Sequence, residues 1–184
     1  MGKRSNFERR KSDFYETFDP VCRDTLLPHI AKGVKYWEPC AGRLALVELL
    51  ADHAECVIAT DKSENVYTPI EGVYRVDALD VCESDIPSDV DCIITNPPWT
   101  RIKSEPVLHD MIEHFRVMRP TWLLFDADWM FTLQSSPMMK FCHTVVAIGR
   151  VKWIRGSKTK GKDNCAWYLF DNHEAPTEFI GRFP

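Results

Sequence analysis

Short apolar runs alternate with polar turns along most of the chain. Runs within 35–42, at 55–61, within 73–80, at 92–95 and at 121–126 are rich in β-branched or aromatic residues, which predicts strands. Apolar residues at helical spacing predict helices from Pro20 to between 29 and 33, at 44–51 and at 107–118. Asp19 before Pro20 is a typical helix start. Two later β-rich runs, 145–154 and 165–170, flank a Gly/Ser/Lys loop and predict a long hairpin.

The run at 92–95 is followed at once by Asn96-Pro97-Pro98-Trp99. Its apolar, β-branched composition is typical of a parallel strand buried on both faces. The prolines have no N–H for a sheet, so the strand must end in a rigid polar turn, where open α/β sheets bind ligands. Asn96 offers a side-chain carbonyl and an amide, Pro97 a free backbone carbonyl and Trp99 a flat face, which suits a planar ring with an amino group. The alternative is a plain turn followed by a core aromatic.

The composition indicates one soluble, intracellular domain. A chain of 184 residues with 45% hydrophobic residues can bury a sizeable core, and it has no apolar run near the ~20 residues of a membrane span. We expect a basic flexible arm at 1–12 and a single domain at 13–184, without a separate target-recognition domain. The seven cysteines include no C-x-x-C pair, which indicates reduced thiols and neither a zinc ribbon nor a disulfide framework.

The distribution of charge matters more than its sum. A net charge of −4 argues against a general nucleic-acid binder. However, residues 1–11 contain five Lys/Arg and one Glu, and residues 150–162 contain six Lys/Arg and no acid. Two basic segments on an acidic body suit local contacts with phosphates. The alternative is that both segments are simply solvated.

The stretch Asp91 to Trp99, DCIITNPPW, resembles the catalytic (D/N)-P-P-(Y/F/W) motif of S-adenosylmethionine-dependent methyltransferases that act on exocyclic or amide nitrogens. The segment DFYETFDP before the first predicted helix resembles the cofactor-binding F-Y-x-T-P segment of the same enzymes. Tyr15 and Thr17 match that segment, and Phe18 replaces the usual proline. The resemblance implies that this aromatic and threonine hold the methionine end of the cofactor.

The turn after the first predicted strand resembles the E-P-x-x-G-x-G loop of this family, in which small residues let the backbone approach the amino-acid part of the cofactor. The residues of this loop implied to bind the cofactor are Glu38, Pro39, Cys40, Ala41 and Gly42. Leu44 replaces the second glycine, so we expect a narrower approach and a weaker affinity. Dinucleotide and ATP sites are set aside, because neither G-x-G-x-x-G nor G-x-x-x-x-G-K-[ST] occurs.

Acids at two predicted strand ends complete the cofactor site. Asp61, followed by Lys62, lies about 20 residues after the glycine turn, the spacing at which a carboxylate meets ribose hydroxyls in Rossmann-like folds. A helix cap is the alternative for Asp61. In the family, an acid after the third strand hydrogen-bonds the adenine amine. Asp77 with Ala78 is the matching pair, and Asp80 is a nearby rival.

The resemblance covers nearly the whole chain, in the unpermuted order of the gamma group of N6-adenine DNA methyltransferases. It implies an α/β fold with a Rossmann-like, seven-stranded class I sheet, mostly parallel with a C-terminal antiparallel hairpin. It also implies methyl transfer from S-adenosylmethionine to an exocyclic amino nitrogen, with adenine N6 in DNA preferred. RNA adenine, protein glutamine and a non-catalytic binding protein are the alternatives.

The expected roles follow from these matches. The catalytic group is Asn96, Pro97, Pro98 and Trp99, with Asn96 also touching the cofactor. The residues expected to contact nucleic acid are Arg101, Lys103, Arg155, Lys158, Lys160 and Lys162. We expect a nucleic-acid partner, DNA before RNA, with weak or very short sequence specificity. We expect no metal, no membrane association, and a location in the cytoplasm of a bacterium or a phage-infected cell.

Overall fold

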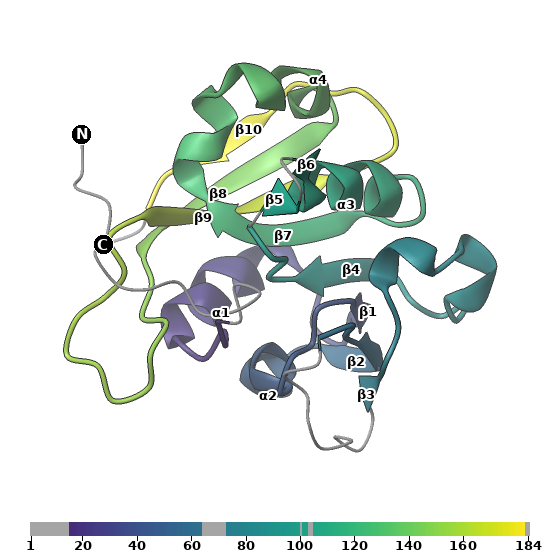
Figure 1. The fold of residues 1–184 in the computed structure, drawn as a ribbon, viewed down its shortest axis with the longest axis horizontal. Coiled ribbons are helices and arrows are strands. Elements are labelled where there is room, and N and C mark those ends of the chain that lie inside the picture. The colour runs from purple at the N-terminus through teal and green to yellow at the C-terminus, as the bar shows by residue number, and fades with distance from the viewer. Residues whose placement is uncertain (1–14, 64–72, 100, 103–104, 183–184) are drawn as a thin grey trace.

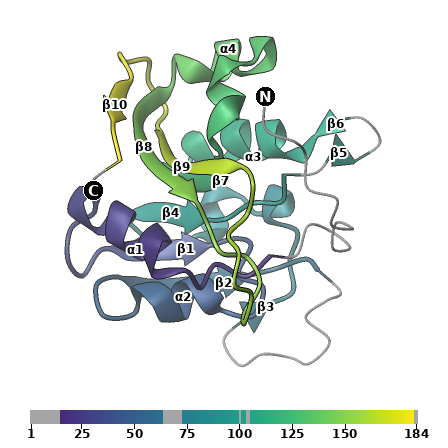
Figure 2. The same ribbon diagram turned by 90° about the vertical axis from the view of Figure 1, so that its left-hand side faces the viewer.

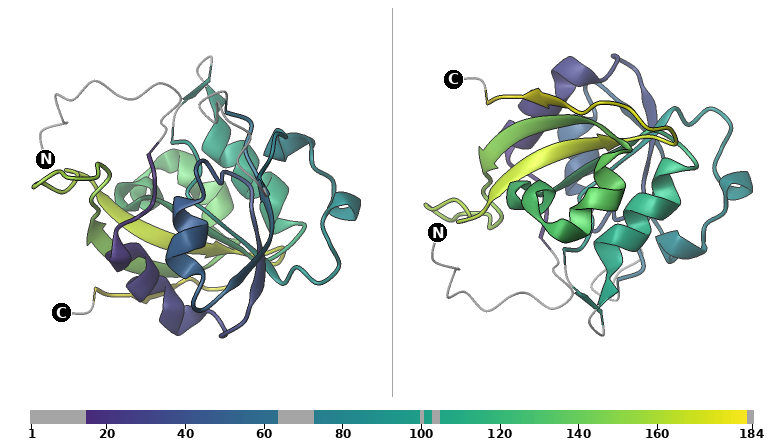
Figure 3. Two further views of the ribbon diagram at one scale, coloured as in Figure 1. Left: turned by 90° about the horizontal axis from the view of Figure 1, so that it is seen from below. Right: turned by 90° about the horizontal axis from the view of Figure 1, so that it is seen from above.

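The computed structural model describes residues 15–63, 73–99, 101–102 and 105–182, which form three layers with a sheet in the middle (Figure 1). Helices α1 (Pro20–Leu26) and α2 (Ala45–Leu50) lie on one face of the sheet, and α3 (Val107–Arg116) and α4 (Ser136–Met139) on the other (Figure 3). The arm expected at 1–12 lies outside the described residues.

The central sheet has the strand order β10-β8-β9-β7-β4-β1-β2-β3. In chain order its strands are β1 (Lys35–Glu38), β2 (Glu55–Thr60), β3 (Val73–Tyr74), β4 (Cys92–Thr95), β7 (Thr121–Asp126), β8 (Cys142–Arg150), β9 (Asn164–Phe170) and β10 (Glu178–Ile180). From β1 the chain moves outward through β2 to β3, then returns to β4 on the other side of β1. The carboxyl ends of β1 and β4 meet at this change of direction, which is where such sheets bind ligands.

Successive residues of the inner strands face opposite layers, because side chains alternate along a strand. In β4, Ile93 packs in the core beneath α3, whereas Ile94 packs in the core beneath α1 and α2. Leu123 and Leu124 of β7 divide in the same way. All four side chains are fully buried, which confirms that the run at 92–95 is an inner strand.

The predicted hairpin is present as the antiparallel pair of β8 and β9. β8 ends at Arg150, not at 154, one residue after Gly149, whose φ of 85° follows a shift in the register with β9. β10 adds to β8 in parallel, so the sheet has eight strands where seven were expected. Its three residues are mostly exposed and carry no apolar alternation, which is why the sequence did not predict it. The expected class, a mostly parallel α/β sheet with an antiparallel strand near its C-terminal end, is confirmed.

Local capping chemistry places the helices. Asp19 Oδ1 accepts the N–H of Val21 at 3.3 Å, and Pro20 occupies the first turn of α1. A 3-10 turn, η2 (Leu27–His29), follows α1 and ends within the predicted range. α2 begins after Leu44, which precedes it in a left-handed conformation.

The remaining described elements are short. They are the strands β5 (Arg101–Ile102) and β6 (Glu105–Pro106), which pair with each other, and the 3-10 turns η3 (Ala78–Asp80), η4 (Glu83–Asp85), η5 (Ala127–Phe131) and η6 (Leu133–Ser135). No helix among the described residues is long and apolar enough to span a membrane. The seven cysteines are all free thiols, and only Cys82 is well exposed.

Candidate active site

Asn96, directly after β4, is held by the segment that precedes α1. Its Nδ2 donates to the carbonyl oxygen of Tyr15 at 3.3 Å and to Oγ1 of Thr17 at 3.0 Å. A carbonyl oxygen can only accept, so the contact with Tyr15 determines which end of the amide is nitrogen. Asn96 Oδ1 is buried and has no hydrogen-bond partner in the described part of the chain. A ligand that carries an N–H would satisfy this oxygen.

The segment 15–19 is itself fixed to the body of the protein. Thr17 is buried, and Asp19 uses its second oxygen, Oδ2, to accept the N–H of Lys152 at 2.8 Å. Two residues predicted to bind the cofactor, Tyr15 and Thr17, therefore contact the predicted catalytic asparagine directly, across about 80 positions of the sequence.

Glu38, the last residue of β1, is a buried acid. Its Oε1 accepts the N–H of Cys40 at 3.1 Å, whereas its Oε2 has no hydrogen-bond partner within the described ranges. Burial raises the pKa of Glu38 to about 8, although the nearby Thr95 hydroxyl and the Cys40 N–H act in the opposite direction. Thr95 Oγ1 lies next to this carboxyl and makes no well-aligned hydrogen bond to any described residue. Unsatisfied polar atoms thus gather at the adjoining ends of β1 and β4.

The glycine turn is held against the end of β2. The N–H of Ala41 donates to the carbonyl of Thr60 at 2.9 Å, and the N–H of Gly42 donates to Asp61 Oδ2 at 2.8 Å. Gly42 has a φ of 51° and Leu44 a φ of 64°, both left-handed. Leu44 occupies the position of the second glycine in the related motif, and its backbone has the left-handed conformation that glycine favours. This conformation costs a leucine about 1–2 kcal/mol of conformational energy.

Asp61 is almost fully buried at the end of β2. Besides the Gly42 N–H, it accepts the N–H of Ser63 through Oδ1 at 2.6 Å. The alternative of a helix cap falls on residues 64–72, outside the described ranges, and the contacts present join Asp61 to the glycine turn and to Ser63. Each carboxylate oxygen can accept a second hydrogen bond, so the predicted ribose contact stays a prediction.

Asp77 and Lys62, both predicted to lie at the cofactor, form an ion pair with an Nζ–Oδ2 distance of 2.9 Å. Asp77 Oδ1 also caps η3 by accepting the N–H of Leu79 at 3.2 Å. Ala78 is buried, whereas its rival neighbour Asp80 is exposed. These contacts bring the ends of β2 and β3 together, and the adenine contact of Asp77 stays a prediction.

Trp99 is half-buried and firmly oriented. Its Nε1 donates to the carbonyl of Leu124 on β7 at 3.3 Å. Its ring meets Trp153 edge to face, with ring centroids 5.8 Å apart and planes at 89°. Pro97 is buried and Pro98 half-buried, so the turn after Asn96 is packed against the protein.

The basic loop, residues 151–163 between β8 and β9, lies beside α1 and the segment before it (Figure 2). Trp153 also approaches the Tyr15 ring, with centroids 6.4 Å apart. The Arg155 guanidinium sits 4.7 Å from the centre of the Phe18 ring, a cation–π contact. The other predicted phosphate ligands of the loop, Lys158, Lys160 and Lys162, are exposed. Arg101 opens β5, but its side chain and Lys103 lie outside what the structure describes.

Two residues of this region were not predicted from the sequence. Trp153 was missed because the run 145–154 was interpreted as one strand, although its position beside a Gly/Ser/Lys loop is a signal that it lies outside the sheet. Thr95 was treated only as a strand residue. Its hydroxyl is buried without a well-aligned partner among the described residues because of the way β4 lies next to β1, and a local sequence pattern cannot predict that arrangement.

No protein-family model and no curated protein sequence matches the chain. Solved structures do match. A dimethyladenosine transferase from Plasmodium falciparum has 16% identity and a TM-score of 0.53, over 85% of this chain and 62% of that one. A protein from Pyrococcus horikoshii described as an RNA methyltransferase has 18% identity and a TM-score of 0.55, over 95% and 94%. A protein from Vibrio vulnificus described as a modification subunit of a type I restriction enzyme has 14% identity and a TM-score of 0.57, over 93% and 48%.

These likenesses show the fold. The chain has the Rossmann-like fold of class I S-adenosylmethionine-dependent methyltransferases. It spans less than two thirds of the Plasmodium and Vibrio structures and nearly the whole of the Pyrococcus one.

Proposed function

We propose that this protein transfers a methyl group from S-adenosylmethionine to an exocyclic amino nitrogen, with adenine N6 in DNA as the preferred substrate. The observation that carries the proposal is the state of the Asn96 amide. Its nitrogen is held by Tyr15 and Thr17, and its oxygen is buried without a partner among the described residues. This leaves one fixed acceptor at the carboxyl end of an inner strand, in a methyltransferase fold.

The residues at the strand ends fit this cofactor. The turn at Gly42 brings backbone close to the end of β2, and the buried Glu38 carboxyl has one oxygen, Oε2, without a hydrogen-bond partner in the described ranges. A positively charged ligand beside it would lower the raised pKa of Glu38 and pair with the carboxylate, which suits the ammonium and sulfonium groups of the cofactor. When bound, S-adenosylmethionine supplies the electrophilic methyl group. Glu38, Gly42, Asp61 and Asp77 would hold it.

The amino group of adenine is a poor nucleophile because its lone pair is delocalised into the ring. Asn96 Oδ1 and the carbonyl of Pro97 would accept its two N–H hydrogens, draw the lone pair out of conjugation and aim the nitrogen. Catalysis would then come from orientation and electrostatics, without a covalent enzyme intermediate. Trp99, held by Leu124 and Trp153, would offer its ring to a base taken out of its helix.

Two observations support a nucleic-acid substrate over a protein glutamine. The exposed lysines of the basic loop lie on a segment that is packed against the candidate site through Trp153. The similar structures include a dimethyladenosine transferase and a protein described as an RNA methyltransferase. RNA adenine is the second candidate, favoured by the same two descriptions.

A tritiated-methyl transfer assay with DNA, RNA and protein substrates tests the proposal. We expect incorporation into DNA, with loss of at least about 100-fold in Asn96→Ala, which corresponds to about 2.7 kcal/mol of lost transition-state stabilisation. Asp52→Ala, at an exposed position after α2, is the control and should keep full activity. Label in RNA or protein alone would reassign the substrate. No cofactor binding to the wild type by calorimetry would favour a non-catalytic binding protein.

A further inference from the structure

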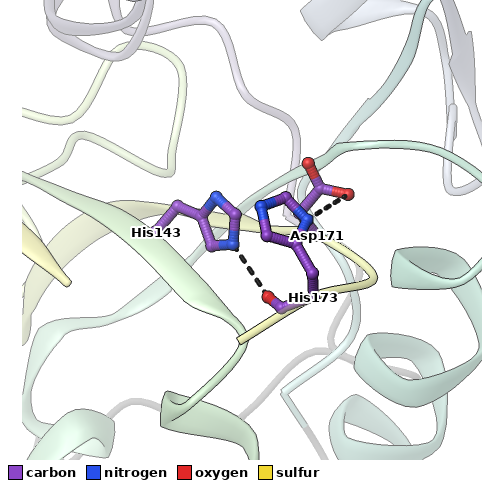
Figure 4. Close-up of side chains that lie close together, drawn as sticks. All are labelled: His143, Asp171 and His173. Carbon is purple, nitrogen blue, oxygen red and sulfur yellow. Dashed lines mark hydrogen bonds and ion pairs between the residues drawn. The ribbon is translucent and has the colours of Figure 1, made fainter. Parts of the chain in front are cut away.

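A second group of polar side chains lies at the opposite ends of the strands from the candidate active site. His143 near the start of β8 faces Asp171 and His173, which follow the end of β9 (Figure 4). One potential ligand atom from each residue lies within 4.8 Å of the other two. Because β8 runs in the direction of β1 and β4 and β9 runs against them, this cluster is at the amino ends of the parallel strands.

The backbone that carries the cluster is firmly held. Cys142 and Phe170 are register partners of β8 and β9, one residue before His143 and Asp171 respectively. The N–H of Asp171 donates to the carbonyl of Phe141 at 3.0 Å. His143 lies in β8 at a register shift between Cys142 and Thr144, and Asp171 directly follows the last residue of β9, so the backbone of both is held by the pairing of β8 with β9.

A backbone carbonyl orients the first histidine. His143 Nε2 lies 2.9 Å from the carbonyl oxygen of His173. A carbonyl accepts only, so Nε2 carries the proton, and in a neutral imidazole Nδ1 keeps the lone pair. Histidines that bind metals usually donate their other ring N–H to a carbonyl or carboxylate in this way.

The other two side chains complete a set of nitrogen and oxygen donors. The imidazole rings of His143 and His173 meet edge to face with centroids 4.5 Å apart, and His173 Nδ1 lies 3.9 Å from Asp171 Oδ1. The His173 side chain is 65% exposed and that of Asp171 is 24% exposed, so an ion can reach both from solvent.

We propose that His143, Asp171 and His173 bind a divalent transition-metal ion of the Zn²⁺ type. Two imidazole nitrogens and one carboxylate oxygen with water in the remaining position are a common Zn²⁺ set, whereas Mg²⁺ and Ca²⁺ take oxygen ligands. Bonds of about 2.0–2.1 Å bring the ligand atoms to about 3.3 Å from one another, so ion binding draws them together from separations of up to 4.8 Å, and the exposed His173 ring has room to move. The ion would tie the connection that leads to β10 onto β8. The expectation of no metal came from the spacing of the cysteines, which gives no information on a site made of histidine and aspartate.

The test is a calorimetric titration of the full chain with Zn²⁺. We expect one ion to bind per chain. The affinity should fall at least about tenfold in His143→Ala and in His173→Ala, because losing even a hydrogen bond that supports a metal ligand reduces metal affinity by about that factor. His53→Ala is the matched control, because His53 is also half-buried and its Nε2 also lies against a carbonyl, that of Ile30 at 3.1 Å. Cys82→Ser controls for the exposed thiol.

Thermal unfolding gives an independent readout. At one fixed Zn²⁺ concentration, Zn²⁺ should raise the Tm of the wild type, of His53→Ala and of Cys82→Ser by the same amount and that of His173→Ala by less, because stabilisation falls as the affinity of the folded state falls. The exposed position of His173 keeps that variant folded, which circular dichroism checks. Equal Zn²⁺ affinity in the wild type and in His173→Ala would overturn the site. So would loss of binding in Cys82→Ser alone, or no binding to the wild type.

Discussion

At the carboxyl ends of β1 and β4, two side chains each have one polar atom hydrogen-bonded to the protein and another polar atom without a partner among the described residues. Asn96 has both contacts of its amide nitrogen filled and its oxygen free, and Glu38 has one oxygen bonded and one not. Unsatisfied buried acceptors cost stability, so they are kept where a ligand uses them. This pattern gives the proposed methyltransferase site its physical basis.

The left-handed conformation of Leu44 leads to a prediction about stability. Leu44→Gly and Leu44→Ala remove the same side-chain contacts and differ in the cost of a φ of 64°. We expect Leu44→Gly to be more stable than Leu44→Ala by about 1 kcal/mol, the reverse of the usual order of these residues in helices. Urea unfolding measures the difference. An alanine variant as stable as the glycine variant would contradict the assigned conformation.

Glu38 leads to a prediction about pH. Its folded-state pKa of about 8 lies above the value of about 4.3 expected in an unfolded chain, so the native state binds the proton more tightly. The stability that Glu38 contributes is complete below about pH 4 and is lost as pH rises through 8. Relative to Glu38→Gln, the wild type should lose about 1.4 kcal/mol per pH unit between pH 5 and 7.5. Denaturant unfolding at several pH values measures this slope, and Glu48→Gln, on the exposed side of α2, is the control. Parallel profiles for the wild type and Glu38→Gln would show that Glu38 is already ionised.

At the scale of elements, the site is made by segments that are not regular structure. The segment 15–19 and the basic loop meet in three contacts: the bond from Lys152 to Asp19, the pairing of Trp153 with Tyr15 and the stacking of Arg155 on Phe18. Position 161 of the loop favours glycine, because a Cβ there would lie only 3.0 Å from the Trp153 ring. The basic loop is therefore packed directly on the segment that holds Asn96.

Trp153→Ala should release the basic loop. Its two aromatic pairs, with Trp99 and Tyr15, are worth about 0.5–1.5 kcal/mol each, so losing both raises the open population by about tenfold. Limited trypsin digestion should then cleave faster after the exposed Lys158 and Lys160. Ile154→Ala, a change at the next, exposed residue, should leave the cleavage rate unchanged. Equal rates in both variants would mean that Trp153 does not anchor the loop.

At the scale of the whole molecule, charge is separated by position. The chain carries a net charge of −4, yet the basic loop lies at the edge of the sheet where the candidate site is. A local basic surface on an acidic body directs a polyanion to one place and discourages binding elsewhere. This supports the proposal that the site acts on nucleic acid.

Neutralising the exposed lysines of the loop tests this idea. The triple change of Lys158, Lys160 and Lys162 to Gln should weaken DNA binding and lower the slope of log affinity against log salt by up to about 2.7, since each phosphate contact contributes about 0.9. The matched control is the same change at Lys32, Lys35 and Lys140, which lie at the other edge of the sheet. Fluorescence anisotropy at several salt concentrations measures both. Equal slopes in the two triple variants would exclude the loop as the phosphate contact.

The sequence by itself determined the elements and the chemistry of the motif. The Asp19-Pro20 helix start, the inner strand at 92–95 and the hairpin around the basic loop could all be predicted, because capping, alternation and turn composition act between neighbours in the chain. The resemblance at Asn96 to Trp99 pointed to the class of fold for the same reason, since the motif is contiguous.

Only the tertiary structure decided which distant groups meet. Four features each depend on segments far apart in the sequence: the anchoring of Asn96 by Thr17, the raised pKa of Glu38, the packing of Trp153 on Trp99 and the cluster around His143. The strand β10 also depends on tertiary structure. Its mostly exposed residues form a strand because they pair with β8, and their own sequence pattern does not predict one. Burial, side-chain orientation and unsatisfied hydrogen-bonding groups result from these tertiary contacts, so a local sequence pattern cannot predict them.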